Sequence, residues 1–178
     1  MSMHIALLRA VNVGGRGKIK MAELRAMAEA MGLERVATVL QSGNLVFNAA
    51  PDAALEARLE RQIEQRFAIK SAVIVRSSRA WAGIIAENPF GEAAAEDPSH
   101  LLVMLLKTAP LDAGEHRLQA AIKGRETVRV IGQTAYLVYP DGVGDSKLTT
   151  AVIERHLGAQ GTARNWNTVE KLAAIAAA

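Results

Sequence analysis

The sequence predicts an α+β protein made of two tandem ferredoxin-like βαββαβ units joined by a helical connector. One observation is that strand-type and helix-type patterns alternate in the same order twice along the 178 residues. Another is composition: 50% hydrophobic and 22% charged residues are typical of a globular chain that can bury a core. We expect the first unit over residues 1–76, the connector over 77–99 and the second unit over 100–178.

The first half carries the pattern βαββαβ. Its second element is predicted as a helix because Leu24 and Ala28 fall on one face and Gly32 follows as the residue after the helix end. The polar turn after residue 40 predicts a hairpin. The expected elements are a strand over residues 4–10, a helix over 21–31, a hairpin over 36–40 and 45–47, an amphipathic helix over 55–67 and a strand over 72–75.

The second half repeats this order after a connector with a short helix over 81–86 and an acidic stretch between Pro89 and Pro98. The two halves share no obvious residue identity, so the repeat depends on element order. The expected elements are a strand over residues 101–106, a helix over 114–122, a hairpin over 127–131 and 135–139, a helix over 147–157, a strand over 159–163 and a final helix over 168–177.

Composition excludes several classes of function. The absence of cysteine rules out disulfides, thiolate nucleophiles and cysteine-ligated metals. The histidines His4, His100, His116 and His156 lack metal-ligand spacing, so we predict neither a metal nor a cofactor. We expect no membrane span and no secretory signal, and therefore a cytoplasmic protein. A net charge of +3 permits a phosphate-bearing partner without demanding one.

The glycine-rich turn after the first strand is the strongest functional signal. Gly14 and Gly15 precede Lys18 and Lys20, and no carboxylate occurs before Glu23. Backbone N–H groups of such a turn can face an anion, and the lysines reinforce the field. The glycine spacing fits neither the phosphate-loop nor the dinucleotide fingerprint. The alternative is a plain connection with solvated lysines.

A second group of candidates is polar and lies in other loops. Arg9, at the end of an apolar strand, is costly unless paired or aimed into a site. Asn167 is predicted to cap the last helix, with Glu170 completing a capping box. Ser42-Gly43 is predicted as a two-residue turn that its neighbours simply brace. The full set of predicted ligand-binding residues is Arg9, Asn12, Gly14, Gly15, Lys18, Lys20, Gln41, Ser42, Asn44, Lys147, Arg164 and Asn165.

Four segments carry a family resemblance: ALLRAVNVGGRGKIKMAEL, QSGN, DGVGDSKLT and TARNWNTVEKL. Together they resemble a bacterial family classed as a domain of unknown function, number 1697, over nearly the whole chain. The resemblance implies tandem, related α+β subdomains with no established activity. Ala10-Val11 stands where the family typically has Gly-Ile, which weakens any need for glycine there.

Three classes of function remain. The first is binding of a phosphorylated small molecule or nucleotide in a cleft between the halves, with Arg164 and Asn165 facing Arg9, Asn12, Gln41 and Asn44. The second is a nucleic-acid-binding or protein-interaction module, for which Phe47 is the sole candidate for base stacking on the inner strands of the first half. The third is an enzyme, for which Asp145 is the one carboxylate considered beside the candidate amides and cations, and Ser42 has no evident base.

Overall fold

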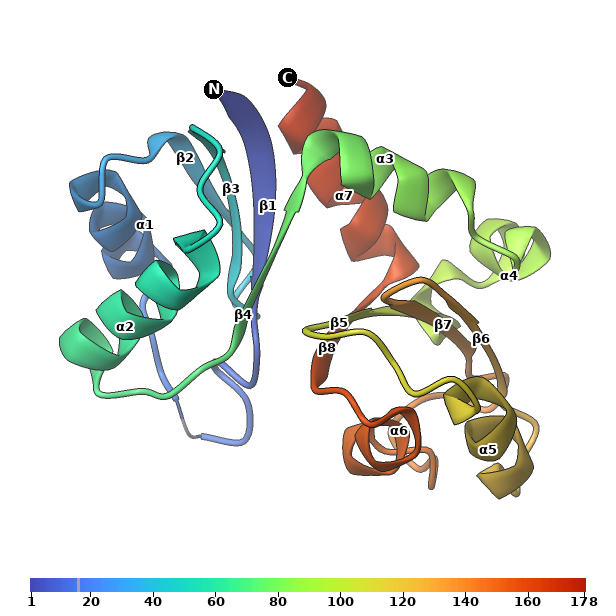
Figure 1. Ribbon diagram of the computed structural model, residues 1–178. Coiled ribbons are helices and arrows are strands. Elements are labelled where there is room, and N and C mark those ends of the chain that lie inside the picture. The colour runs from blue at the N-terminus through green and yellow to red at the C-terminus, as the bar shows by residue number, and fades with distance from the viewer. Residues whose placement is uncertain (16) are drawn as a thin grey trace. The chain divides into compact units, whose positions relative to one another are not determined.

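The computed structural model describes residues 1–15 and 17–178, so Arg16 of the glycine-rich turn lies outside the described residues. The protein is a mixed α+β fold, with two four-stranded antiparallel sheets and seven α-helices in the described part of the chain (Figure 1). It forms two compact units. The first comprises Met1–Gly83 and Leu172–Ala178, and the second comprises Ile84–Lys171.

The first unit contains one sheet with the strand order β2-β3-β1-β4. All neighbouring strands are antiparallel, and Ile5 of the central strand β1 lies opposite Val46 on one side and Arg76 on the other. In chain order the elements are β1 (Ser2–Leu8), α1 (Met21–Ala30), β2 (Glu34–Val39), β3 (Asn44–Ala49), α2 (Leu55–Phe67), β4 (Val73–Ser77) and the start of α3 (Ser78–Ala86).

The core of the first unit lies between the sheet and helices α1 and α2, which cover the same face in Figure 1. Alternation along β1 turns Ala6 and Leu8 toward these helices, where they pack with Leu24 and Leu59. The predicted apolar face of α1 is confirmed, because Leu24 and Ala28 are fully buried. The opposite sheet face is buried too, as the 0% exposure of Ile5 shows.

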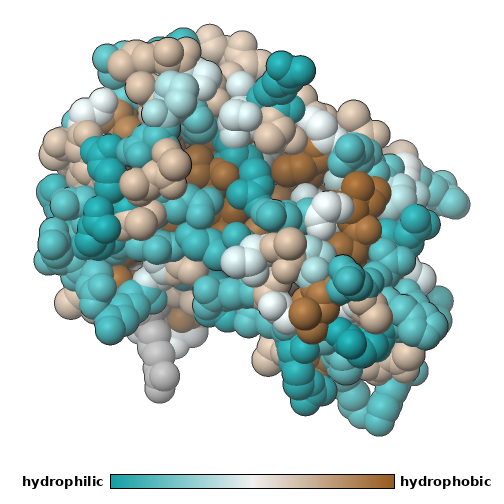
Figure 2. Space-filling model, viewed as in Figure 1, coloured by the Kyte–Doolittle hydropathy of each residue, from teal (hydrophilic) through white to brown (hydrophobic). Residues whose placement is uncertain are grey.

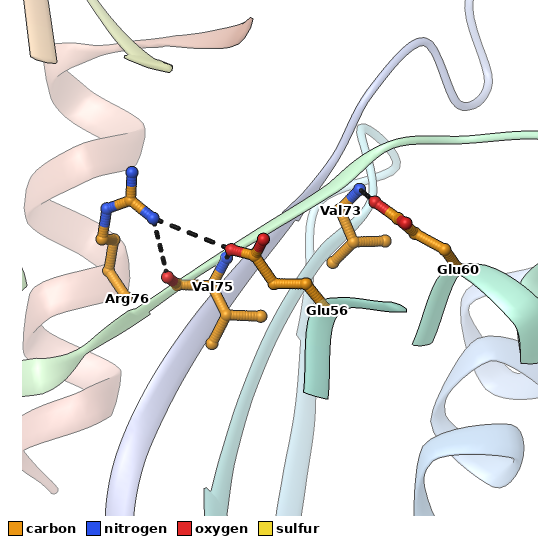
Figure 3. Close-up of polar contacts among 5 residues, drawn as sticks. All are labelled: Glu56, Glu60, Val73, Val75 and Arg76. Atoms are coloured by element: carbon orange, nitrogen blue, oxygen red, sulfur yellow. Dashed lines mark hydrogen bonds and ion pairs between the residues drawn. The ribbon is translucent and has the colours of Figure 1, made fainter. Parts of the chain in front are cut away.

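Glutamates of α2 protect the free edge of β4 (Figure 3). Glu60 and Glu56 accept hydrogen bonds from the backbone N–H groups of Val73 (2.9 Å) and Val75 (2.8 Å). The Arg76 guanidinium donates to the Val75 carbonyl at 2.9 Å and lies 3.8 Å from the Glu56 carboxylate. Burial lowers the pKa of Arg76, and Glu56 opposes that shift. Satisfied edge N–H groups leave less of a template for strand addition.

The second unit contains a sheet with the strand order β6-β7-β5-β8, again antiparallel throughout. Helix α4 was not predicted from the sequence. The helix expected over 147–157 begins only at Thr150, so Lys147 belongs to the preceding loop. In chain order the elements are α4 (Gly91–Glu96), a 3₁₀ turn (Pro98–His100), β5 (Leu101–Leu106), α5 (Gly114–Ala121), β6 (Thr127–Ile131), β7 (Thr134–Val138), α6 (Thr150–Leu157), β8 (Gly161–Asn165) and the start of α7 (Trp166–Ala177).

The edges of the second sheet are protected in the same way as β4. Glu115 of α5 accepts a hydrogen bond from the Val130 N–H at 2.7 Å, and Glu154 of α6 accepts one from the Gly161 N–H at 3.2 Å. Both helices pack on one face of this sheet through Leu118 and Leu157. Each helix therefore supplies apolar side chains to the core and a carboxylate to a sheet edge.

The exposed surface carries few large apolar side chains. Hydrophilic residues predominate on the face drawn in Figure 2, and strongly hydrophobic colour is limited to scattered areas. Among the described residues, the exposed large hydrophobic side chains are Met1, Val13, Leu40, Leu111 and Val143.

Both tyrosines of the chain are buried in the second unit, which gives a test by alkaline titration. The Tyr136 hydroxyl donates to the Ile84 carbonyl at 2.6 Å, and the Tyr139 hydroxyl donates to the Leu148 carbonyl at 3.0 Å. Burial, and secondarily Glu87 and Glu126 respectively, raises the pKa of each phenol to about 12.

We therefore expect no phenolate absorbance at pH 10 in the folded protein. Because the folded pKa exceeds the unfolded value, the phenols stabilise the fold fully below pH ~10, and this contribution is lost as pH rises toward 12. Ultraviolet absorbance and circular dichroism, recorded together, should show phenolate appearing with unfolding. Ionisation of a tyrosine near pH 10 in folded protein would contradict this packing.

Candidate functional site

A hollow of about 440 Å³ lies beside the loop between β1 and α1 in the first unit. Its volume falls in the range of about 300–1,000 Å³ that is usual for small-molecule sites. The structure brings together there several of the residues predicted from the sequence. The lining residues of this N-terminal hollow are Asn12, Gly15, Lys18, Ile19, Lys20, Glu23 and Gln41.

Asn12 holds the walls of the N-terminal hollow together. Its side-chain amide donates to the carbonyls of Ile19 (3.0 Å) and Gln41 (2.7 Å), and its Oδ1 accepts from the Ile19 N–H at 2.8 Å. Its backbone N–H donates to the Gly17 carbonyl at 3.0 Å, and its φ of +57° is one that asparagine tolerates well. Both amide hydrogens are engaged, so Asn12 positions the loop and the β2–β3 turn.

The glycine-rich turn leaves one side of the hollow open. Gly15 has a φ of +75°, and a Cβ placed there would have no atom within 4 Å. Gly17 is tighter, because a Cβ there would lie 3.1 Å from the Ala10 carbonyl oxygen. Positive φ is strained for any L side chain and most of all for a β-branched one, so glycine keeps this backbone accessible.

The remaining wall combines cations with a helix start. Lys20 precedes the first residue of α1, and its side chain makes no capping hydrogen bond. Lys18 and Lys20 are exposed and line the hollow, and Glu23 lies in the first helical turn. Ammonium groups beside the positive end of a helix dipole attract an anion, while the Glu23 carboxylate can accept hydrogen bonds from hydroxyl or amino groups.

Two predicted residues of the first unit have structural roles outside the hollow. Asn44 is fully buried, and its amide donates to the Val39 carbonyl at 2.6 Å and to the Ser42 hydroxyl at 3.0 Å. It braces the β2–β3 connection, which is the alternative considered above. Arg9 is half-buried just after β1, where its backbone N–H donates to the Ala72 carbonyl at 2.9 Å.

The prediction of a two-residue turn at Ser42-Gly43 is wrong. Val39 and Asn44 are the last facing pair of the hairpin, so the loop covers residues 40–43. Leu40 and Gly43 both adopt positive φ, which gives the chain its reversal. The Gly43 carbonyl accepts from the Leu8 N–H at 2.8 Å, which ties this loop to the end of β1.

The predicted residues of the second unit lie in two places. Lys147 lines a separate hollow in that unit. Arg164, in β8, is largely buried and donates to the Thr162 hydroxyl and the Ala163 carbonyl, both at 2.9 Å. Burial lowers its pKa to about 10. That Arg164 and Asn165 face residues of the first unit stays a prediction.

The predicted capping box at Asn167 is wrong. Helix α7 begins at Trp166, and Asn165 is its cap: Oδ1 accepts from the Thr168 N–H and from the Thr168 hydroxyl, both at 3.0 Å. Asn167 is exposed inside the helix. Strand β8 runs to Asn165, two residues beyond the predicted end, and this moves the helix start forward.

We expect Asn165→Ala to lower the free energy of unfolding by about 1 kcal/mol, because it removes the cap of α7. Asn167→Ala is the matched control and should change it by less than ~0.5 kcal/mol, since the side chain is exposed within the helix. Urea unfolding of both variants measures the difference. Equal effects, or a larger effect at Asn167, would place the cap elsewhere.

Two structural absences concern residues 1–15 and 17–178. Within these residues, no three His, Asp or Glu side chains come close enough to hold a metal ion, and no helix has the length and apolar character needed to cross a bilayer. The described lining of the N-terminal hollow offers Glu23 as its one carboxylate and no histidine. The same described lining carries two cations, Lys18 and Lys20.

Comparison with known proteins supports the predicted family. No curated protein matches the chain. The fold is similar to that of the conserved bacterial protein SP0830 from Streptococcus pneumoniae, with a TM-score of 0.67 at 20% identity over 98% of each chain. The model of a family described as a protein of unknown function, DUF1697, matches residues 1–136. The predicted resemblance is confirmed, and the chain belongs to the DUF1697 family.

Proposed function

We propose that the first unit binds a phosphate-bearing small molecule, a nucleotide or a sugar phosphate, in the N-terminal hollow. The observation that carries this proposal is the position of Lys18 and Lys20 beside an uncapped helix start and a glycine turn, on one hollow of about 440 Å³. The two ammonium groups outnumber the Glu23 carboxylate there. A bound phosphate would pair with the two ammonium groups and would also be attracted by the positive end of the helix dipole at the start of α1.

Two exposed apolar residues that neighbour lining residues in the sequence indicate the organic part of the ligand. Val13, which follows Asn12 in the chain, is 64% exposed, and Leu40, which precedes Gln41, is 49% exposed. Val13 and Leu40 neighbour lining residues in the sequence, and exposed apolar side chains so placed favour a ligand with an apolar body over inorganic phosphate. The Glu23 carboxylate can accept from sugar hydroxyls or from the amino group of a base. A nucleotide offers all of these groups.

We also infer that each unit is ferredoxin-like, with residues 77–99 as the connector. Support comes from the matching strand orders, β2-β3-β1-β4 and β6-β7-β5-β8, and from two helices on one face of each sheet. In this arrangement the loop after the central strand β1 lies next to the β2–β3 turn, and Asn12 links the two. The fold thereby places the hollow at one end of the sheet.

The proposal is tested first by a thermal-shift screen with nucleoside monophosphates and sugar phosphates. A ligand present at about 100 times its Kd stabilises the protein by roughly 2.7 kcal/mol. For the ligand with the largest shift, Lys18→Ala combined with Lys20→Ala should weaken binding at least ~tenfold, because each lysine makes a charge-assisted contact. The melting temperature without ligand should hardly change, since both side chains are exposed.

The matched control is Lys70→Ala combined with Lys171→Ala, which removes the same charge from two exposed lysines that do not line the N-terminal hollow. Calorimetric titration should give wild-type affinity for this variant. Gly15→Val should weaken binding as well, because its side chain would occupy the open backbone. Unchanged affinity in the Lys18, Lys20 variant would place the phosphate elsewhere.

Nucleic-acid binding is the second candidate, and one observation favours it. A groove of about 360 Å³ between α1 and α2 is lined by Arg58, Arg61 and Arg66 and by no carboxylate among its described residues. Base stacking on the sheet is disfavoured, because Phe47 is fully buried in the core under α1 and α2. Salt-dependent binding of single-stranded RNA that is lost on Arg61→Ala with Arg66→Ala would favour this function.

A further inference from the structure

A second hollow, of about 500 Å³, lies entirely within the second unit. It is formed by the end of α5, the loop over residues 141–148 and the exposed side of α6. We infer that this second-unit hollow binds an organic anion with an apolar body, such as an aryl carboxylate. The inference is independent of the phosphate site, because the two hollows share no lining residue.

The charges of the second-unit hollow favour an anion. Most of its carboxylates are already engaged: Asp141 pairs with the Arg125 guanidinium, which lowers the pKa of Asp141, and Glu126 accepts from the Ser146 hydroxyl. Asp145 is the remaining carboxylate and is exposed.

Three cations line the same hollow. Lys123, Lys147 and Arg155 make no ion pair with any residue that the structure describes. Lys147 and Arg155 are exposed, so they can meet a ligand without disturbing the core. Among the described lining residues, these three cations face two carboxylates that no ion pair neutralises, Glu126 and Asp145, and this excess of positive charge favours an anionic group.

The wall beneath these cations is apolar. Leu148 belongs to the core of the second unit, and Ile122 and Val152 pack against that core while also lining the hollow. Val143, in the loop over residues 141–148, is 42% exposed. An inorganic anion would leave these surfaces in water, whereas an aryl or acyl body would cover them.

His156 provides an independent observation. Its Nε2 atom is buried and has no hydrogen-bond partner in the described structure, although the side chain lines the hollow. Buried polar atoms in folded proteins are nearly always hydrogen-bonded, so an unpartnered one beside a hollow marks a place for a ligand group. Both Arg155 and His156 line the hollow, so a ligand carboxylate bound by the Arg155 guanidinium could also accept from His156 when its Nε2 atom carries the proton.

The test uses 1-naphthoate as the probe, with neutral 1-naphthamide and acetate for comparison, in calorimetric and NMR titrations of the full chain. We expect 1-naphthoate to bind, and each comparison compound to bind at least ~tenfold more weakly, because one lacks the charge and the other the apolar body. Amide shifts should concentrate on residues 121–126 and 141–156. Equal binding of 1-naphthamide, or shifts in the first unit alone, would overturn the inference.

Variants locate the contacts. Lys147→Gln combined with Arg155→Gln should weaken 1-naphthoate binding at least ~tenfold, and His156→Phe should weaken it several-fold while keeping a ring of similar size. Arg117→Gln is the charge control, because Arg117 is exposed on α5 outside the hollow. Wild-type affinity in the Lys147, Arg155 variant, or an equal loss in Arg117→Gln, contradicts the inference even if His156→Phe does not fold.

Discussion

Replacing Asn12 by alanine is expected to lower the free energy of unfolding by about 2.5–5.5 kcal/mol and to abolish phosphate binding. Three side-chain hydrogen bonds to Ile19 and Gln41 would be lost, each contributing about 0.5–1.5 kcal/mol. Alanine also fits the φ of +57° less well than asparagine, at a cost of roughly 1 kcal/mol. The loop that carries Lys18 and Lys20 would lose its attachment to the β2–β3 turn.

Asn12→Asp distinguishes the hydrogen bonds that the Asn12 side chain donates from the one that it accepts. It keeps the acceptor for the Ile19 N–H but sets a second carboxylate oxygen against the carbonyls of Ile19 and Gln41, so its loss of stability should equal or exceed that of Asn12→Ala. Urea unfolding measures stability, and titration with the best ligand of the phosphate screen measures binding. If Asn12→Ala unfolds like the wild type, the bracing role is wrong.

The second large effect is expected at Gly43, in the loop that ends the β2–β3 hairpin. A Cβ there would lie 2.9 Å from the Leu8 Cβ in the core, and the φ of +80° is strained for alanine. We expect Gly43→Ala to lower the free energy of unfolding by about 2–4 kcal/mol, combining backbone strain of roughly 1 kcal/mol with overpacking.

Gly132→Ala is the control for Gly43→Ala. Gly132 has a φ of +57° in the β6–β7 turn, and a Cβ there would meet nothing within 4 Å. It should cost about 1 kcal/mol, from backbone strain alone. The difference between the variants, measured by chemical unfolding, isolates the contact with Leu8. Equal losses would show that Gly43 is not packed against β1.

The sequence predicted an element's bounds well where a long run of regularly spaced apolar residues defines that element. The four-residue spacing from Leu55 to Phe67 gave the bounds of α2, and the apolar run over 101–106 gave those of β5. Ends that depend on long-range pairing were missed. Strand β8 runs to Asn165 because Leu102 pairs with it, and no local pattern contains that information.

The candidate site was likewise predictable only where its signals are local in the sequence. The glycines and lysines of the first loop drew attention because their chemistry is local. The hydrogen bond from Asn12 to Gln41 joins residues far apart in the sequence, so no local pattern predicts that Asn12 braces the site. Glu23 lines the hollow because it lies in the first turn of α1. The amphipathic pattern over 55–67 does not indicate that Glu56 and Glu60 bond to β4.

An internal correspondence also escaped the sequence pattern. Arg76 in β4 and Arg164 in β8 occupy equivalent positions in the two sheets. Arg76 lies opposite Ile5 of the central strand β1, and Arg164 lies opposite Val103 of the central strand β5. Each guanidinium donates to the carbonyl of the preceding residue. Each is followed by a helix cap, Ser77 with the Ala80 N–H at 3.2 Å and Asn165 with that of Thr168. The two units therefore repeat these contacts, although the arginine is the only residue that is identical between the two segments.

The most direct test of the phosphate site is an amide NMR titration of the full chain with the ligand that gives the largest thermal shift among the nucleotides and sugar phosphates. The proposal predicts that the largest shift changes fall on Gly15, Ile19, Lys20 and the first turn of α1, and that they vanish in Lys18→Ala with Lys20→Ala. A binding ligand whose changes lie elsewhere, or a full panel that leaves these amides unmoved, would contradict it.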